Sequence, residues 1–155
     1  MIRFPPTEIA IKIALSLGLG LLVGLEREWA HKDLGVRTFA ITALLGMLSA
    51  LLGPEFSIAS MVGIFLVIAA VNGRNVLNNR SLETTTSVAL LVTLVLGVLV
   101  GQGHLFTPVA SVIVMTMLLA WKTELHRFAG GLTPGEVRSA VLLGLLGFVV
   151  YPVLP

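Results

Sequence analysis

The chain has 155 residues, of which 56% are hydrophobic and only 12% are charged. Soluble domains carry about 25% charged residues, so this composition and a mean hydropathy of +1.00 indicate an integral membrane protein with no soluble domain. The net charge of +2 forms no basic stripe, which excludes nucleic acid as a partner and leaves the lipid bilayer. The chain has no cysteine, which excludes disulfides and thiolate chemistry.

Six apolar segments follow one another along the chain, each near the lower end of the ~17 to 25 residues that a crossing needs. They are residues 9–25, 38–52, 56–71, 85–101, 105–121 and 140–154. The second segment is short and the last contains Pro152, so a buried or re-entrant helix is the alternative for either of them. We therefore predict an all-α polytopic transmembrane bundle of five to six spans.

Small residues recur at four-residue intervals in the first, second and fourth segments. In lipid, such faces let helix backbones approach closely and mark helix contacts. These three segments are therefore the predicted inner bundle, and the bulky fifth segment is predicted to face lipid. The contacts can lie within one chain or in a homodimer. The glycines predicted to pack are Gly20, Gly24, Gly46, Gly97 and Gly101.

Lys12 is the one charge inside the first segment, one to two turns from its start. At that depth its ammonium can snorkel to the outer surface, which we expect. The alternative is a functional intramembrane charge.

Apart from Arg3 and Lys12, lysine and arginine are confined to alternate connections, which predicts the orientation. The connections after the first, third and fifth segments hold Arg27, Lys32, Arg37, Arg74, Arg80, Lys122, Arg127 and Arg138. The connections after the second and fourth segments hold none. By the positive-inside rule the basic connections are cytoplasmic, and the amino terminus is outside.

The first of these connections carries the densest charge. Glu26 ends the first segment, where the helix dipole is negative, and Arg37 begins the second, where it is positive, so each charge is at its unfavourable end. A contact between Glu26 and Arg37 would offset both costs, and we predict that pair. The alternative is that these charges are solvated signals of topology.

A second polar group follows the third segment. Asn72 and Asn75 share a helical face, and Glu83, Thr84 and Thr85 come shortly after. Amide and carboxylate oxygens can hold a hydrated cation such as magnesium. The favoured alternative is a helix end and turn, where such side chains cap backbone groups. No other cofactor is predicted, and the metal, if one binds, is unspecified.

Residues 122–136 are short, mixed in charge and broken by glycine and proline, so we expect a cytoplasmic interfacial helix and turn. The chain has no HExxH motif, P-loop or nucleophile elbow. His31, His104 and His126 are far apart in sequence and on different predicted sides of the membrane. We therefore expect a protein that is not an enzyme.

Three motifs in order resemble the membrane domain of the MgtC/SapB family. They are the run at 24–28, the Leu-Gly-Val-Arg-Thr run at 34–38, and the threonines at 84–86 followed by Gly97 and Gly101. The resemblance implies a multi-pass protein of the bacterial inner membrane, linked to survival at low magnesium or in acid and to modulation of other membrane proteins. On the motif match, Glu26, Arg27, Arg37 and Thr38 are the residues expected to be functional.

The chain departs from the MgtC type at its carboxyl end. MgtC-type members have a soluble cytoplasmic domain after five spans, whereas this chain has a sixth hydrophobic segment. It is therefore similar to longer relatives in which an MgtC-like first half precedes a second hydrophobic half. Residues 1–155 are expected to be one such domain, from the amino-terminal part of a longer protein.

Two functions follow. The first is a regulator or scaffold that binds another membrane protein through its small-residue faces, with Glu26, Arg27 and Arg37 shaping a cytoplasmic docking or ligand surface. The second is a cation or small-solute transporter whose cytoplasmic vestibule is formed by Glu26, Arg37, Asn72, Asn75 and Glu83. Ionisable residues at midplane depth usually mark a transport path, and the spans hold almost none, which favours the regulator.

Overall fold

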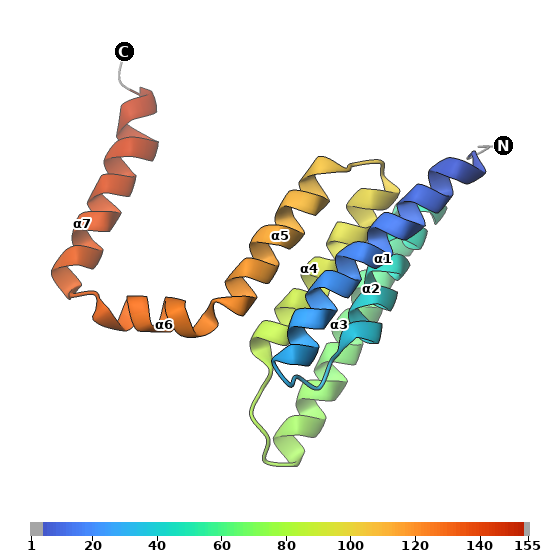
Figure 1. Cartoon of the computed structure of the whole chain (residues 1–155), viewed down its shortest axis with the longest axis horizontal. Coiled ribbons are helices and arrows are strands. Elements are labelled where there is room, and N and C mark those ends of the chain that lie inside the picture. The colour runs from blue at the N-terminus through green and yellow to red at the C-terminus, as the bar shows by residue number, and fades with distance from the viewer. Residues whose placement is uncertain (1–4, 154–155) are drawn as a thin grey trace. The chain divides into compact units, whose positions relative to one another are not determined.

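The computed structural model describes residues 5–153, which are almost entirely helical. The chain divides into two compact units, Met1–Ala120 and Trp121–Pro155. The first unit holds five helices: α1 (Pro6–Trp29), α2 (Val36–Leu52), α3 (Pro54–Leu77), α4 (Thr84–Gly101) and α5 (Phe106–Ala120) (Figure 1). This confirms the predicted all-α bundle.

Helices α1, α2 and α4 form the centre of the first unit, as predicted. The most extensive helix contacts are those of α2 with α4 and with α1 (Figure 1). Helix α2 runs antiparallel to α1, because Gly20 lies against Phe39 and Gly24 lies against Val36. It runs parallel to α4.

The five glycines of the small-residue faces lie where helix backbones meet within the chain. A Cβ atom at Gly20 or Gly24 would lie 2.5 Å from backbone atoms of α2. Gly46 lies against the carbonyl of Leu94 and Gly97 against the carbonyl of Ala43, while a Cβ at Gly101 would lie 2.6 Å from Met47 O. These glycines therefore serve intrachain packing, and none of them is free for a homodimer contact.

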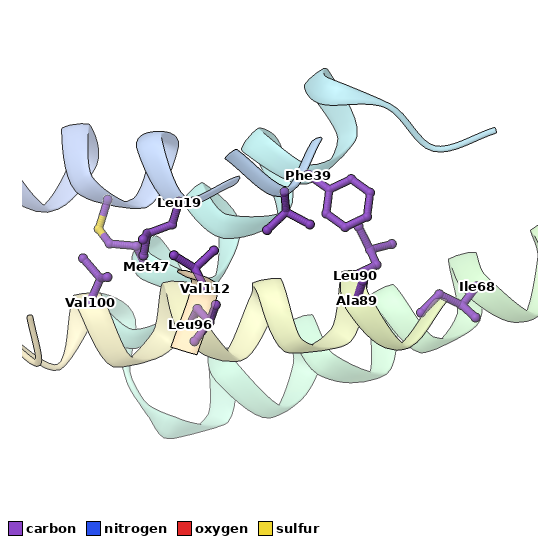
Figure 2. Packing of buried hydrophobic residues seen from close by; sticks show 10 residues of the cluster. Leu19, Phe39, Met47, Ile68, Ala89, Leu90, Leu96, Val100 and Val112 are labelled. Carbon is purple, nitrogen blue, oxygen red and sulfur yellow. The ribbon is translucent and has the colours of Figure 1, made fainter. Parts of the chain in front are cut away.

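Apolar side chains fill the space between the three helices. Phe39 and Met47 of α2 and Leu90 and Val100 of α4 have no exposed surface, and Phe39 points toward Leu90 (Figure 2). Burial of this kind contributes about 25 cal/mol per Å² of apolar surface relative to water, but lipid is itself apolar. Tight packing therefore stabilises the bundle here more than the hydrophobic effect does.

Helices α3 and α5 lie outside this centre. Helix α3 has two buried residues, Ile68 and Asn75, and α5 has two, Pro108 and Val112. The rest of α3 is largely exposed, and the rest of α5 is exposed or half-buried, as expected for surfaces that face lipid or another membrane protein. The prediction that α5 is mostly lipid-facing agrees with this exposure.

Among the described residues, four helices are long and apolar enough to cross a membrane, or up to five if α5 and the next helix form one bent span. The four are α1, α3, α4 and the segment Pro134–Val153. The 17 residues of α2 span about 25 Å at 1.5 Å per residue, somewhat less than the ~30 Å hydrocarbon core. The upper count of five agrees with the lower bound of the prediction.

The first helix is longer than its predicted segment. Residues 9–25 were expected, but α1 continues to Trp29, so Glu26 and Arg27 lie in its last turn rather than after it. Arg27 contacts Glu26 within this turn, so the helix continues past the apolar segment without leaving either charge unpaired.

Lys12 does not snorkel. Its side chain is buried, and Nζ donates to Gly101 O at 3.1 Å and lies 3.0 Å from Glu8 Oε1. Gly101 ends α4, where backbone carbonyls lack helical partners and the dipole is negative. A cation is favourable at that point, so the ammonium turns into the bundle and ties α1 to the end of α4.

The second unit contains α6 (Lys122–Gly131) and α7 (Pro134–Leu145), followed by a π-helical turn, Leu146–Val150, and a 3₁₀ turn, Tyr151–Val153. Helix α6 matches the expected helix within residues 122–136. Helix α7 begins six residues before the predicted start at residue 140, because Thr133 and Glu136 form a capping box. Residue 154 of the predicted segment lies outside the described residues.

Candidate functional site

One end of the first unit carries a polar cluster, here called the charged end. It joins the loop between α1 and α2 to the connection between α3 and α4. Lys32 Nζ of the first loop lies 3.3 Å from Glu83 Oε1, at the start of α4. Asn75 of α3 is buried, and its Nδ2 donates to Asp33 Oδ2 at 3.4 Å. Two predicted cytoplasmic connections therefore meet at this end.

Glu26 binds its neighbour Arg27, and the predicted contact with Arg37 does not form. Arg27 Nε contacts Glu26 Oε2, and only 4% of the Arg27 side chain and 11% of the Glu26 side chain are exposed. Arg37 is exposed, and within residues 5–153 no ion pair joins it to Glu26. Glu26, at the negative end of the α1 dipole, therefore has a cation as its partner, but that cation belongs to the same helical turn.

Burial of Arg27 and Lys12 follows from a periodicity that the small residues already display. Ser16, Gly20 and Gly24 lie on the buried face of α1. Extending that face four residues back reaches Lys12, and extending it three residues forward reaches Arg27. The signal for both buried cations was therefore present in the sequence.

Arg37 and Thr38 line a polar pocket of about 490 Å³ beside the α1–α2 loop. Its lining residues are Glu28, Lys32, Asp33, Gly35, Val36, Arg37 and Thr38. Glu26 lies in a different hollow of about 620 Å³, between α1 and α5, with Trp29 and Thr116 among its lining residues. The residues expected to form one vestibule are thus divided between separate hollows.

Glu28 holds the start of α2. Its Oε2 accepts from the backbone N–H of Val36, the first residue of α2, at 3.4 Å. A carboxylate at a helix amino terminus pairs a free N–H and favours the dipole. Gly35 makes room for this carboxylate, because a Cβ atom there would overlap Glu28 Oε2.

We expect Gly35→Ala to lower the free energy of unfolding by about 0.5–1.5 kcal/mol, because the new methyl group displaces the Glu28 cap. Glu28→Ala should cost a similar amount, and the double variant should cost no more than either single one. Unfolding in detergent by SDS titration measures all three. Additive losses would show that Gly35 and Glu28 act separately.

The second polar group lies at the joint of α3 and α4, here called the α3–α4 joint (Asn72, Glu83, Thr86 and Ser87). Asn72 Nδ2 donates to Ser87 Oγ at 2.8 Å and to Ile68 O at 3.1 Å. Ser87 Oγ in turn donates to Glu83 O at 2.9 Å. Of the predicted site residues, Asn72, Asn75 and Glu83 therefore come together at this end.

Thr84 and Thr85 are exposed, and the inward-facing residues of the same run are Thr86 and Ser87. Thr86 is 1% exposed. It extends the buried face of Ala89, Thr93 and Gly97 by one turn toward the start of α4. That periodicity identifies Thr86, whereas the threonine motif by itself does not distinguish it from Thr84 and Thr85.

The polar side chains at this end carry amide, carboxylate and hydroxyl oxygens, which are the ligands that hard cations such as magnesium prefer. Across the part of the chain that the structure describes, no three His, Cys, Asp or Glu side chains are grouped as they would be to hold a metal ion. Asn72 and Ser87 serve partly as helix-end partners, in keeping with the capping interpretation. Three oxygen atoms at the α3–α4 joint are nevertheless buried without a hydrogen-bond partner in the described part of the chain: Asn72 Oδ1, Glu83 Oε2 and Thr86 Oγ1.

Comparison with protein families matches the MgtC family over residues 13–128, which includes α2 to α5, α1 from residue 13 onward and the first part of α6. A search of curated proteins gives no match. A search of solved structures gives none either. The match covers every residue of the charged end, and it agrees with the resemblance seen in the motifs.

Proposed function

Since this chain belongs to the MgtC family, we propose that it is a bacterial inner-membrane protein that modulates another membrane protein in magnesium or acid-stress homeostasis. Family membership and the apolar helices make it a membrane protein and support a general role in magnesium or stress homeostasis. We further propose that the membrane is the bacterial inner membrane, that the chain acts by modulating another protein, and that it is not an enzyme.

The close packing of α1, α2 and α4 supports modulation rather than transport. Between the charged end and Lys12, the contacts of α1, α2 and α4 are made by glycines against backbone and by fully buried apolar side chains. The buried hydroxyls of Ser16, Ser49 and Thr93 donate to carbonyls of their own helices, at 3.0, 2.8 and 2.8 Å. They therefore offer no chain of polar groups to a passing ion.

The surfaces left for a partner are the outer helices and the charged end. Helix α3 is long enough to cross a membrane, yet only 6% of its apolar window is buried. Arg37 and Thr38 line a polar pocket, and Asp33 of the same pocket accepts a hydrogen bond from Asn75 of α3. A second membrane protein, or a second copy of this chain, can contact both the apolar helix and the polar pocket from the predicted cytoplasmic side.

One observation favours transport instead, namely the buried ammonium of Lys12. Ionisable side chains within spans often lie on ion or proton paths. Lys12, however, has Gly101 O and Glu8 as partners, which explains its burial by helix packing. Transport of a cation or small solute is therefore the second candidate.

Ion flux into proteoliposomes tests these two functions. For the purified chain we expect no saturable flux of magnesium, protons or potassium above that of empty liposomes.

In a strain that lacks the gene, we expect the wild-type chain, but not Glu26→Gln, to restore growth at low magnesium or low pH. Glu55→Gln, at the opposite end of α3, is the matched control and should restore growth. Saturable flux that is lost in Glu26→Gln would establish the transporter.

A further inference from the structure

We propose that the hollow between α1 and α5 is a binding groove for one phospholipid whose headgroup ends in a primary ammonium, such as phosphatidylethanolamine. This hollow, here called the α1–α5 groove, has a volume of about 620 Å³, and typical ligand pockets measure about 300–1,000 Å³. The inference goes beyond the proposed function and does not depend on it. It rests on the lining of the groove, which changes from apolar to acidic along α1.

The deeper part of the groove is apolar. Helix α5 follows the end of α4, where Lys12 of α1 is bound, so α1 and α5 run parallel toward the charged end. Leu22 and Leu25 of α1 line the groove together with Thr116 and Ala120 of α5. The two leucines are exposed and precede the last turn of α1. They therefore lie at the depth of lipid acyl chains rather than of headgroups.

The other part of the groove is acidic and lies at the end of α1. Glu26, Glu28, Trp29 and His31 line it. Glu26 is neutralised by its contact with Arg27, whereas Glu28 has no ion pair within residues 5–153. Glu28 thus gives the groove one negative charge that no lining side chain balances.

Glu28 keeps one carboxylate oxygen for a ligand. Its Oε2 accepts from the backbone N–H of Val36, and Oε1 has no hydrogen-bond partner among the described residues. Lys32 and Arg37 line the neighbouring polar pocket with Glu28, but neither forms an ion pair with it. Trp29 is 87% exposed, so its ring is also accessible to a ligand.

This change in polarity matches a phospholipid in the predicted cytoplasmic leaflet. An acyl chain fits the apolar part of the groove, and the headgroup ammonium can donate to Glu28 in a charge-assisted hydrogen bond. The ring of Trp29 can add a cation–π contact. An anionic headgroup would instead be repelled by Glu28, and a quaternary ammonium has no N–H to donate. The groove therefore favours a lipid with a primary ammonium.

Quenching of Trp29 fluorescence by brominated lipids tests this preference. The purified full chain carries Trp121→Phe, which leaves Trp29 as its one tryptophan. It is reconstituted in phosphatidylcholine bilayers with brominated phosphatidylethanolamine or brominated phosphatidylglycerol of the same acyl chains. The relative binding constant should be at least about threefold higher for phosphatidylethanolamine, because an exposed ion pair changes binding by a few-fold.

Glu28→Gln should bring the ratio of the two binding constants to about one, because the charge is lost. The glutamine oxygen can still accept from the N–H of Val36, so the start of α2 is preserved. Glu55→Gln, at the opposite end of α3, is the matched control and should leave the ratio unchanged. Ala120→Leu, which narrows the groove without changing its charge, should lower the binding constant of phosphatidylethanolamine to that of phosphatidylglycerol.

Three results would overturn the groove. They are equal binding constants for the two lipids, a higher constant for phosphatidylglycerol, and a preference that persists in Glu28→Gln, which would mean that Trp29 meets bulk lipid only. Ala120→Leu decides the question if Glu28→Gln does not give a monodisperse helical protein. Because no partner protein enters this assay, its failure would leave the modulating role untouched.

Discussion

Gly97→Ala is expected to separate α2 from α4 and to lower the free energy of unfolding by about 1–3 kcal/mol. The new methyl group would overlap the carbonyl of Ala43, which belongs to the α2 backbone and cannot rotate away as a side chain can. Gly46 lies against Leu94 O across the same seam. Gly46→Ala should therefore cost a similar amount, and the two losses should not be additive, because one separation of the helices accommodates both.

Gly63→Ala is the matched control, because Gly63 also lies within a transmembrane helix but has no atom within 4 Å of an added Cβ. Removing a helical glycine should leave stability unchanged or raise it by up to about 1 kcal/mol. SDS-titration unfolding of the purified variants measures these differences. Equal effects of Gly97→Ala and Gly63→Ala would show that the α2–α4 seam is not close-packed.

Arg27→Ala is expected to lower the free energy of unfolding by about 3–5 kcal/mol, the usual cost of breaking a buried ion pair. The substitution leaves the carboxylate of Glu26, which is only 11% exposed, without its cation. It also removes the buried aliphatic stem of Arg27 at the end of the inner bundle. Arg27→Lys should restore only part of this loss, because an ammonium cannot reproduce the contact made by Nε.

Arg37→Ala is the control for Arg27→Ala, since Arg37 is exposed, and it should change stability by no more than about 0.5 kcal/mol. A double-mutant cycle should give Glu26 and Arg27 a coupling energy of about 1–3 kcal/mol and give Glu26 and Arg37 almost none. A charge swap, Glu26→Arg with Arg37→Glu, should therefore recover nothing. Recovery by that swap would mean that Glu26 binds Arg37 in the membrane after all.

The small-residue intervals predicted the packing correctly, because close approach in lipid has a direct sequence requirement. A glycine every fourth residue presents bare backbone along one face of a helix, as at Gly20 and Gly24. The same regularity implied that Lys12 and Arg27 face inward. For Lys12, that implication was outweighed by the general rule that lysine reaches for the surface. The rule failed because the end of α4 offered the ammonium a carbonyl and a favourable dipole.

The polar contacts were less predictable, because they join residues far apart in the sequence. Asn75 meets Asp33, and Lys32 meets Glu83, only because α3 and α4 bring their connection back to the α1–α2 loop. In the threonine run, position along the helix separates exposed Thr84 and Thr85 from buried Thr86. A motif indicates that such a run matters, but it does not show which hydroxyl faces the bundle.

The sequence by itself determined that the chain is a helical membrane protein, which three helices form its centre, and which glycines lie at their contacts. These properties depend on composition and on periodicity along single helices, and both are local. Only the tertiary structure decided that Glu26 binds Arg27, that Lys12 is buried against Gly101, and that Asn72, Glu83 and Thr86 have buried oxygens without a hydrogen-bond partner among residues 5–153. Those facts depend on which helix ends meet in space, and no local pattern in the chain specifies that.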